Sequence, residues 1–287
     1  MPFFFIVSGL FHKHTGEIQW GKYAKKTLFN VLVFNIVYIV LGGILYNQGW
    51  WSWTPKEYDV QSTALLTMYE MAKCFAKGII LSKNMPNGVT WFLLVLFYCK
   101  VLCDCYHKYR KVTLSLICIL IAISFFVKLP LWIGQGAVAF SFYLLGHYFK
   151  KHILDITNKP HRLFWTVVLL LLTVSLSLLN GKVSIFSLTY GELTRPFNVL
   201  VFYVNALIGS AMLLVLSSYV NKENSIVSFF SGSLVSILVL QMFFIATCRT
   251  FFGEDLPNIV LGIVFTLAIM VFCVFIDKTY SYIQHCK

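Results

Sequence analysis

The sequence predicts an all-α protein that crosses a membrane several times. The 287 residues are 59% hydrophobic and only 12% charged, whereas a soluble domain has about 25% charged residues. The hydrophobic residues are gathered into runs of roughly 20, the length that an α-helix needs to cross a bilayer. We therefore expect one polytopic membrane domain over residues 1–287 and no soluble domain.

Nine apolar segments are expected to be helical. The first, Met1–Phe11, is too short to cross a bilayer and resembles the second half of a span. The others are Thr27–Tyr46, Thr90–Lys111, Val112–Val127, Leu129–Phe149, Leu163–Leu179, Phe197–Tyr219, Ile226–Thr247 and Leu256–Ile276. In the long loop before Thr90, apolar residues such as Leu65, Met68 and Tyr69 recur at helical spacing. This pattern predicts an amphipathic helix in the membrane interface, either a lid over a membrane site or a surface-packed element.

Positive charge is distributed unevenly between alternate loops. Lys and Arg number 14 in loops 12–26, 107–111, 150–162, 220–225 and 277–287, and eight in the intervening loops, which are longer in total. Because Lys and Arg accumulate in cytoplasmic loops, the first set is predicted to face the cytoplasm, with the C-terminus inside and Met1 at the outer face. The net charge of +12 is explained by this bias, because basic loops contact the anionic lipid of the membrane surface. We therefore expect no nucleic-acid partner.

Lys100 and Asp104 are the only charged residues between Trp91 and Tyr106, and hydrocarbon penalises each by about 3 kcal/mol. Their spacing places them on one face of a helix, where they can pair. One interpretation is a polar site that lines a cavity between helices. The other is that Asp104 lies near the headgroups and Lys100 extends toward it along its aliphatic stem.

The eight cysteines form no CxxC pair and have no histidine at a spacing suited to zinc. Cysteine inside an apolar run behaves as a small hydrophobic residue, and this applies to Cys99, Cys103, Cys105, Cys118 and Cys273. We therefore expect no metal site, no bound cofactor and no disulfide framework.

Four stretches of sequence resemble a known family. Met1–Gly9, MPFFFIVSG, resembles the MPLFFFxSG signature of the membrane-bound acyltransferase 3 family, whose bacterial members O-acylate surface polysaccharides and related acceptors. Three further stretches follow in the order of the family: Asn87–Leu93 (NGVTWFL), Phe142–Lys150 (FYLLGHYFK) and Phe229–Phe244 (FFSGSLVSILVLQMFF). Each stretch is mostly apolar, and their order over nearly the whole chain carries the resemblance.

The resemblance implies ten spans with both termini in the cytoplasm, in the inner membrane of a bacterium. This chain supplies nine segments, so we expect that a preceding span, which carries the catalytic His of the family, is encoded upstream or has been lost. Without that His the chain is expected to be inactive; if it is active, the base is to be sought among Lys100, Asp104 and His147. The other histidines are expected to be interfacial or solvated: His12, His14, His107, His152, His161 and His285.

The resemblance also implies acyl-CoA as the co-substrate, with acetyl-CoA as the expected form, and a hydroxyl acceptor on a carbohydrate or glycolipid. The basic motif of the family is represented by Lys22, Lys25 and Lys26. These lysines either contact CoA phosphates or form an ordinary positive-inside cluster against anionic lipid. Three residues are candidates for the acceptor side: Gln241, where the family commonly has a His, and Glu192 and Arg195, which alternatively form a surface ion pair.

Two other functions are compatible with the sequence. A transporter or flippase of a lipid-linked sugar would also be polytopic, but such proteins commonly contain an internal repeat or paired broken spans. Here Pro130, Gly134 and Gly136 interrupt one span only. The third possibility is an inactive remnant of an acyltransferase. The acyl group, the acceptor and the oligomeric state have no signature in the sequence.

Overall fold

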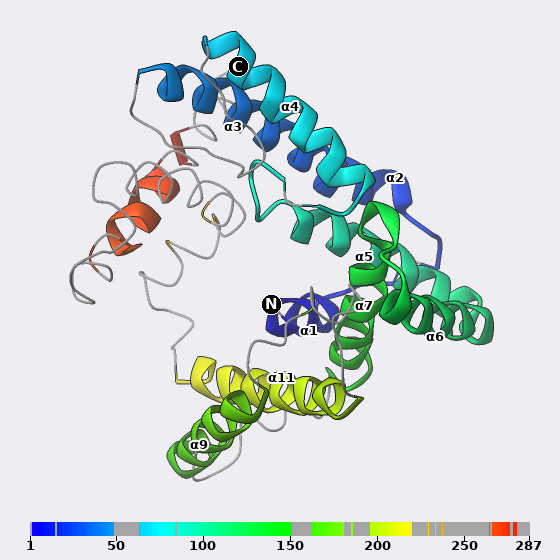
Figure 1. The fold of residues 1–287 in the computed structure, drawn as a ribbon. Helices are drawn as coiled ribbons and strands as arrows, with labels where there is room; N and C mark the ends of the chain where they lie inside the picture. The colour runs from blue at the N-terminus through cyan, green and yellow to red at the C-terminus, as the bar shows by residue number, and fades with distance from the viewer. Residues whose placement is uncertain are drawn as a thin grey trace. The chain divides into compact units, whose positions relative to one another are not determined.

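The structure is a computed structural model, and the residues it describes form helices joined by turns (Figure 1). It describes residues 2–14, 16–48, 63–83, 85–150, 162–180, 196–219 and 266–275, and positions 185, 229, 233, 237, 264, 278 and 279. No strand occurs among these residues. The all-α class predicted from the sequence is therefore confirmed for the described part of the chain.

The helices follow the predicted apolar segments closely. In chain order they are α1 (Pro2–Leu10), α2 (Trp20–Tyr23), the π-helical turn η1 (Ala24–Leu28), α3 (Phe29–Asn47), α4 (Ala64–Ile80), α5 (Trp91–Lys108), α6 (Arg110–Phe126), the 3₁₀ turn η2 (Pro130–Trp132), α7 (Ile133–Tyr148), α9 (Arg162–Asn180) and α11 (Pro196–Ser217). Each predicted segment from Met1–Phe11 to Phe197–Tyr219 overlaps at least one of these helices. Most of Ile226–Thr247 lies outside the described residues, and within Leu256–Ile276 residues 266–275 are helical.

Two helical stretches of the described residues are long and apolar enough to cross a membrane. They are Trp20–Asn47, which joins α2, η1 and α3, and Val199–Ser217 in α11. Two further helices, Leu163–Leu179 and Thr266–Phe275, are apolar but shorter. The structure thus identifies two candidate spans, whereas the predicted number of membrane segments is larger.

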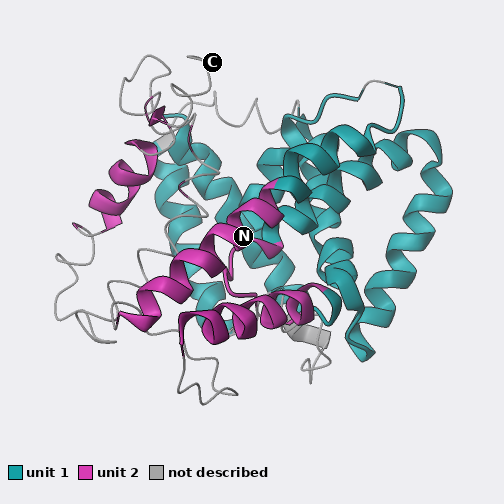
Figure 2. Cartoon of the chain, turned by 90° about the horizontal axis from the view of Figure 1, so that it is seen from above, with its two compact units in different colours: residues 1–29, 80–82, 92–221 teal, residues 30–79, 83–91, 222–287 magenta. Residues whose placement is uncertain are grey.

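The described chain divides into two compact units (Figure 2). Unit 1 comprises residues 1–29, 80–82 and 92–221, and unit 2 comprises residues 30–79, 83–91 and 222–287. Each unit is assembled from stretches that are far apart in the sequence. The prediction of one domain over the whole chain stays a prediction.

Two glycines allow a close crossing of α1 and α7 in unit 1. A Cβ atom on Gly9 would overlap the carbonyl of Tyr143, and a Cβ atom on Gly146 would overlap the carbonyl of Ile6. Small residues let helix backbones approach in this way, which is common among membrane helices. The side of α1 that carries Phe5 is buried as well, and the Phe5 ring lies 4.9 Å from that of Phe92 on α5.

The segment predicted as Leu129–Phe149 is interrupted near its start. Leu131 and Trp132 have φ of 56° and 60°, a left-handed conformation that costs a non-glycine residue about 1–2 kcal/mol. Ser82 stabilises this turn, because its Oγ accepts a 2.7 Å hydrogen bond from the Trp132 N–H and donates one of 2.8 Å to the Leu129 carbonyl. The regular helix α7 therefore begins only at Ile133.

In unit 2 the predicted amphipathic helix is confirmed as α4, but its packing differs from the expected pattern. Met71 is fully buried against Tyr38 and Ile39 of α3. Tyr69, one of the apolar residues that recur at helical spacing, is 61% exposed, while the polar residue Thr67 is buried. The reason is steric: Gly43 of α3 leaves room for the Met68 side chain, so this close approach fixes which face of α4 packs inward.

Candidate functional site

A polar cluster lies in unit 1 where α5, α7 and the segment after α1 meet. Its members come from residues 12–23, from the C-terminal half of α5 and from the C-terminal half of α7. Loops 12–26 and 107–111 are predicted to lie on the same side of the membrane, and their contact agrees with that prediction. Packing of α1 on α7 brings these otherwise distant polar side chains together.

Asp104 of α5 is at the centre of the cluster, and its side chain is completely buried. Its Oδ1 atom accepts hydrogen bonds from the rings of His12 at 3.0 Å and His14 at 3.4 Å. Its Oδ2 atom accepts the backbone N–H of Gln19 at 3.3 Å, and the Tyr23 side chain also bonds the carboxyl group. A buried carboxylate is tolerated when donors surround it in this way, and they stabilise its charged form.

His12 links this carboxylate to a hydroxyl group. Its Nε2 atom contacts Asp104, and its Nδ1 atom lies 2.8 Å from the hydroxyl of Tyr143 on α7. An ionised Asp104 accepts the Nε2 proton, which leaves Nδ1 as a hydrogen-bond acceptor. Only 3% of the His12 side chain is exposed, and burial lowers its pKa even though Asp104 acts in the opposite direction. A neutral imidazole, oriented by a carboxylate and facing a hydroxyl, is the arrangement of a general base.

Among the residues that the structure describes, Lys100 and Asp104 do not form the predicted ion pair. The carboxylate partners are His12 and His14, and the ammonium group of Lys100 lies 5.8 Å from the centre of the Tyr23 ring. The interpretation of a Lys100–Asp104 pair is therefore wrong. The physical reason is that Asp104 already has donors from residues 12–23, which a pattern within one helix cannot reveal.

His107 and His147 form a second pair of imidazoles, joined by a 2.8 Å contact between their Nε2 atoms. The His14 ring stacks on His107, with 4.2 Å between ring centres. The buried Nδ1 atom of His147 has no hydrogen-bond partner of standard geometry, although it lies near the backbone of Gly9. The sulfur of Cys103 completes a group whose ligand atoms lie within 4.8 Å of one another.

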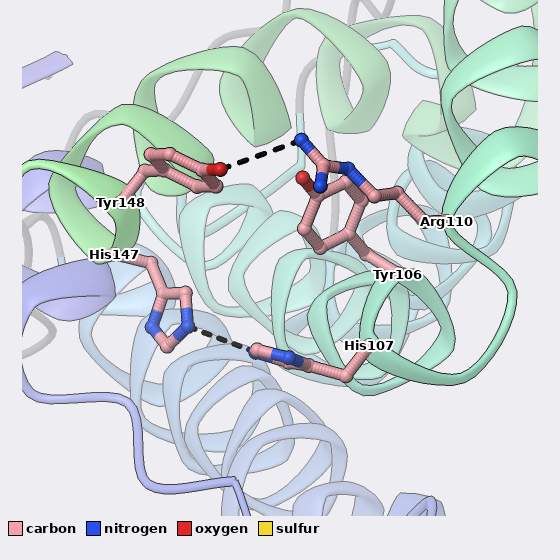
Figure 3. A pocket seen from close by; sticks show the side chains of 5 residues that line it. All are labelled: Tyr106, His107, Arg110, His147 and Tyr148. Carbon is pink, nitrogen blue, oxygen red and sulfur yellow. Dashed lines mark hydrogen bonds between the residues drawn. The ribbon is translucent and has the colours of Figure 1, made fainter.

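This imidazole pair lines an open pocket of about 400 Å³ together with three residues of α5, α6 and α7 (Figure 3). The guanidinium of Arg110 lies over two tyrosine rings, 5.6 Å from the centre of Tyr106 and 5.8 Å from that of Tyr148. It also donates a 3.4 Å hydrogen bond to the Tyr148 hydroxyl. Among the described residues no carboxylate pairs with Arg110. An arginine held in this way is available to an anion, and its planar donors match a phosphate.

The comparisons with known proteins agree with the motifs of the sequence. A family model described as an acyltransferase domain matches residues 1–278. The chain belongs to the acyltransferase 3 family. Searches among curated proteins and among solved structures find no match.

The residues predicted for the site of this acyltransferase 3 chain do not all lie together in the structure. Asp104 and His147 lie in the cluster, while Lys100 lies beside it against Tyr23. The lysines predicted to hold the donor belong to α2 and η1 in the same unit, and their side chains are exposed: Lys22, Lys25 and Lys26. Three acceptor-side candidates lie outside the described residues: Glu192, Arg195 and Gln241.

Several members of the site were not predicted from the sequence. His12 and His14 were expected at an interface and His107 in solvent, whereas His12 is buried and the other two bond or stack within the cluster. A signal was present: Cys103 and His107, like Tyr143 and His147, are four residues apart and share a helix face. Arg110 was counted only as part of the cytoplasmic positive charge. The expectation of no metal site rests on the lack of a CxxC pair and of a histidine at a zinc-binding spacing, and the pair Cys103 and His107 on one helix face goes against its second premise.

Proposed function

We propose that this protein transfers an acyl group, expected to be acetyl, from acyl-CoA to a hydroxyl of a carbohydrate or glycolipid. Membership of the acyltransferase 3 family supports acyl transfer over a transporter. The observation that carries the proposal further is the buried chain Asp104–His12–Tyr143 hydroxyl, with 3.0 and 2.8 Å between successive polar atoms. A base oriented by a carboxylate is what deprotonation of an acceptor hydroxyl requires.

In the proposed reaction Nδ1 of His12 takes the proton of the acceptor hydroxyl. The oxygen attacks the thioester carbonyl, a C–O bond forms, and the C–S bond then breaks. His12 returns the proton to the departing CoA thiolate, so no other reactant is needed. Asp104 holds the ring in the correct tautomer and stabilises the imidazolium that forms transiently. The Tyr143 hydroxyl lies at hydrogen-bond distance from Nδ1, so the space next to this nitrogen accommodates a hydroxyl group that donates a hydrogen bond.

The pocket is the proposed binding place for part of the CoA molecule. It lies beside His12, because the His147 ring that lines it is 5.7 Å from the His12 ring. Its volume of about 400 Å³ is within the range of ligand pockets, about 300–1,000 Å³. Arg110 is placed to bind a phosphate of CoA, and Lys22, Lys25 and Lys26 add positive charge to the same unit. The donor is thus proposed to bind through phosphate contacts.

A polytopic protein of about nine membrane segments in a bacterial inner membrane is part of the proposal. The exposed side chains support it, since Phe126 of α6 is 85% exposed and Leu178 of α9 is 81% exposed. Large apolar side chains with this exposure are expected on surfaces that face lipid. The unequal Lys and Arg counts favour a cytoplasmic C-terminus. In the proposed orientation the pocket, next to loop 107–111, faces the cytoplasmic supply of acyl-CoA.

The orientation predicts the outcome of reporter fusions. A reporter active only outside the cytoplasm should be silent when fused after Lys287 and active when inserted near Trp53. Insertion in loop 150–162, which is predicted to be cytoplasmic, is the control and should also be silent. The reverse pattern of signals would contradict the orientation.

Transfer of labelled acetyl from acetyl-CoA to a glycan acceptor, measured with the 287-residue chain in membranes, tests the proposed function directly.

Replacing Lys22, Lys25 and Lys26 together by Ala should raise the donor KM about tenfold and leave kcat nearly unchanged. The reason is that three exposed contacts of about 0.5 kcal/mol each are equal in the ground and transition states.

The matched control removes three lysines from the loop predicted to be outside, Lys73, Lys77 and Lys83, and should leave the donor KM within twofold. If sugar uptake occurs without acyl transfer, the transporter function is favoured instead. If neither transfer nor uptake is detected with a range of acyl-CoA donors, the chain is an inactive remnant.

A further inference from the structure

We propose that Cys103, His107 and His147 form a binding site for a zinc ion that links α5 to α7. Their ligand atoms all lie within 4.8 Å of one another. This inference does not depend on acyl transfer, because it concerns metal binding by the folded chain itself.

The helices supply the three ligands at spacings that suit one ion. Cys103 and His107 are four residues apart on α5, so both side chains lie on the same helix face. His147, in the last turn of α7, faces them from the neighbouring helix. Two ligands from one helix turn and a third from another helix resemble the way that helical zinc sites are built.

The distance between the two imidazole nitrogens needs only a small adjustment to accept the ion, and the sulfur of Cys103, which lies within 4.8 Å of them, would move closer on binding. Two nitrogen ligands of a tetrahedral zinc ion, each about 2.05 Å from the metal, are about 3.3 Å apart. The Nε2 atoms of His107 and His147 are 2.8 Å apart. Two imidazole nitrogens at this distance must share a proton, since one of them has to donate and the other accept. A zinc ion between them would replace that proton after a shift of about 0.5 Å.

The donor types favour zinc over the hard divalent ions. One thiolate and two imidazoles are borderline-soft ligands that suit zinc better than magnesium or calcium. Cys103 is completely buried and would lose its proton on binding.

Three protein ligands leave one coordination position of a tetrahedral ion for solvent or for a ligand. His107 and His147 line the pocket, so that position is accessible to small molecules. The site would therefore do two things: hold the C-terminal ends of α5 and α7 together, and present a Lewis-acidic ion to the pocket.

Metal binding by the purified full chain in detergent tests this site. The protein should carry a purification tag without His or Cys and be freed of metal with a chelator. Zn²⁺ titrated against a chelating dye should reach one ion per chain. Co²⁺ should give the visible absorption of a tetrahedral site and a thiolate-to-cobalt charge-transfer band. Bound zinc should also raise the Tm, because it binds only the folded state.

The variants assign the ligands. H107Q and H147Q should each weaken zinc binding by at least about tenfold, and C103S should abolish the charge-transfer band. C99S is the matched control, since Cys99 is a buried cysteine one turn earlier on the same helix, and it should retain the band and the affinity. His107 is exposed, so H107Q is expected to fold even if C103S does not.

Wild-type affinity in H107Q, or a charge-transfer band that persists in C103S, would overturn the proposal. Loss of the band in C99S with retention in C103S would also overturn it, because the thiolate would then be a different cysteine. None of these measurements uses acyl-CoA, so failure of acyl transfer and failure of zinc binding are distinguishable.

Discussion

The H12Q variant should lose acyl transfer by about 10²- to 10⁴-fold, the usual contribution of a general base. Gln retains an amide donor for Asp104 and a carbonyl acceptor for the Tyr143 hydroxyl, so both hydrogen bonds of His12 can be replaced. What it lacks is a basic nitrogen. The loss is therefore expected in kcat and in kcat/KM alike, with the donor KM nearly unchanged.

K13Q is the control for H12Q. It introduces the same side chain at the next residue, which is exposed, and should retain transfer within about threefold of the wild type. D104N removes the carboxylate that orients His12 and should also lower kcat. If H12Q keeps wild-type kcat under conditions where transfer is measurable, His12 is not the base.

Replacing Gly9 or Gly146 by Ala is expected to destabilise the protein by about 3 kcal/mol. Each glycine lies where a Cβ atom would overlap a carbonyl of the other helix, so the crossing of α1 and α7 would have to open. Backbone carbonyls cannot move aside as the end of a flexible side chain can. In detergent the Tm should fall by about 6 °C or more. Acyl transfer should fall too, because the same crossing holds His12 against Tyr143.

G21A provides the matched comparison. Gly21 also lies in a helix, α2, but a Cβ atom there meets nothing within 4 Å. Alanine is the better helix former by about 1 kcal/mol, so G21A should leave the Tm unchanged or raise it. Equal Tm values for G9A, G146A and G21A would show that the close crossing does not contribute to stability.

Individual helices were predictable because their signal is local. Apolar runs near the length of a membrane span predicted α3, α6, α9 and α11 to within a few residues. The break before α7 was signalled by Pro130, although the left-handed conformation of Leu131 and Trp132 was not. For α4 the helical spacing was correct, yet the buried face was not the expected one, because the close approach to Gly43 decides it.

The candidate site was predicted only in part. Asp104 was singled out as a charge that needed an explanation inside an apolar segment, and His147 as a candidate base. The partner assigned to Asp104 was wrong, since Lys100 is one helix turn away but its ammonium group lies against Tyr23. The actual partners of Asp104, His12 and His14, are some 90 residues away in the sequence.

The sequence by itself determined that this is a helical, highly apolar member of the acyltransferase 3 family. Composition, span length and ordered motifs are properties of the chain that do not depend on how its helices meet. Only the tertiary structure decided which polar groups act together. The crossing at Gly9 and Gly146 carries His12 to Asp104 and Tyr143, and the approach of α5 to α7 brings His107 to His147. The physical reason is that hydrogen bonding and metal ligation depend on distances of about 2–3 Å, which helix packing sets and sequence spacing within one helix does not.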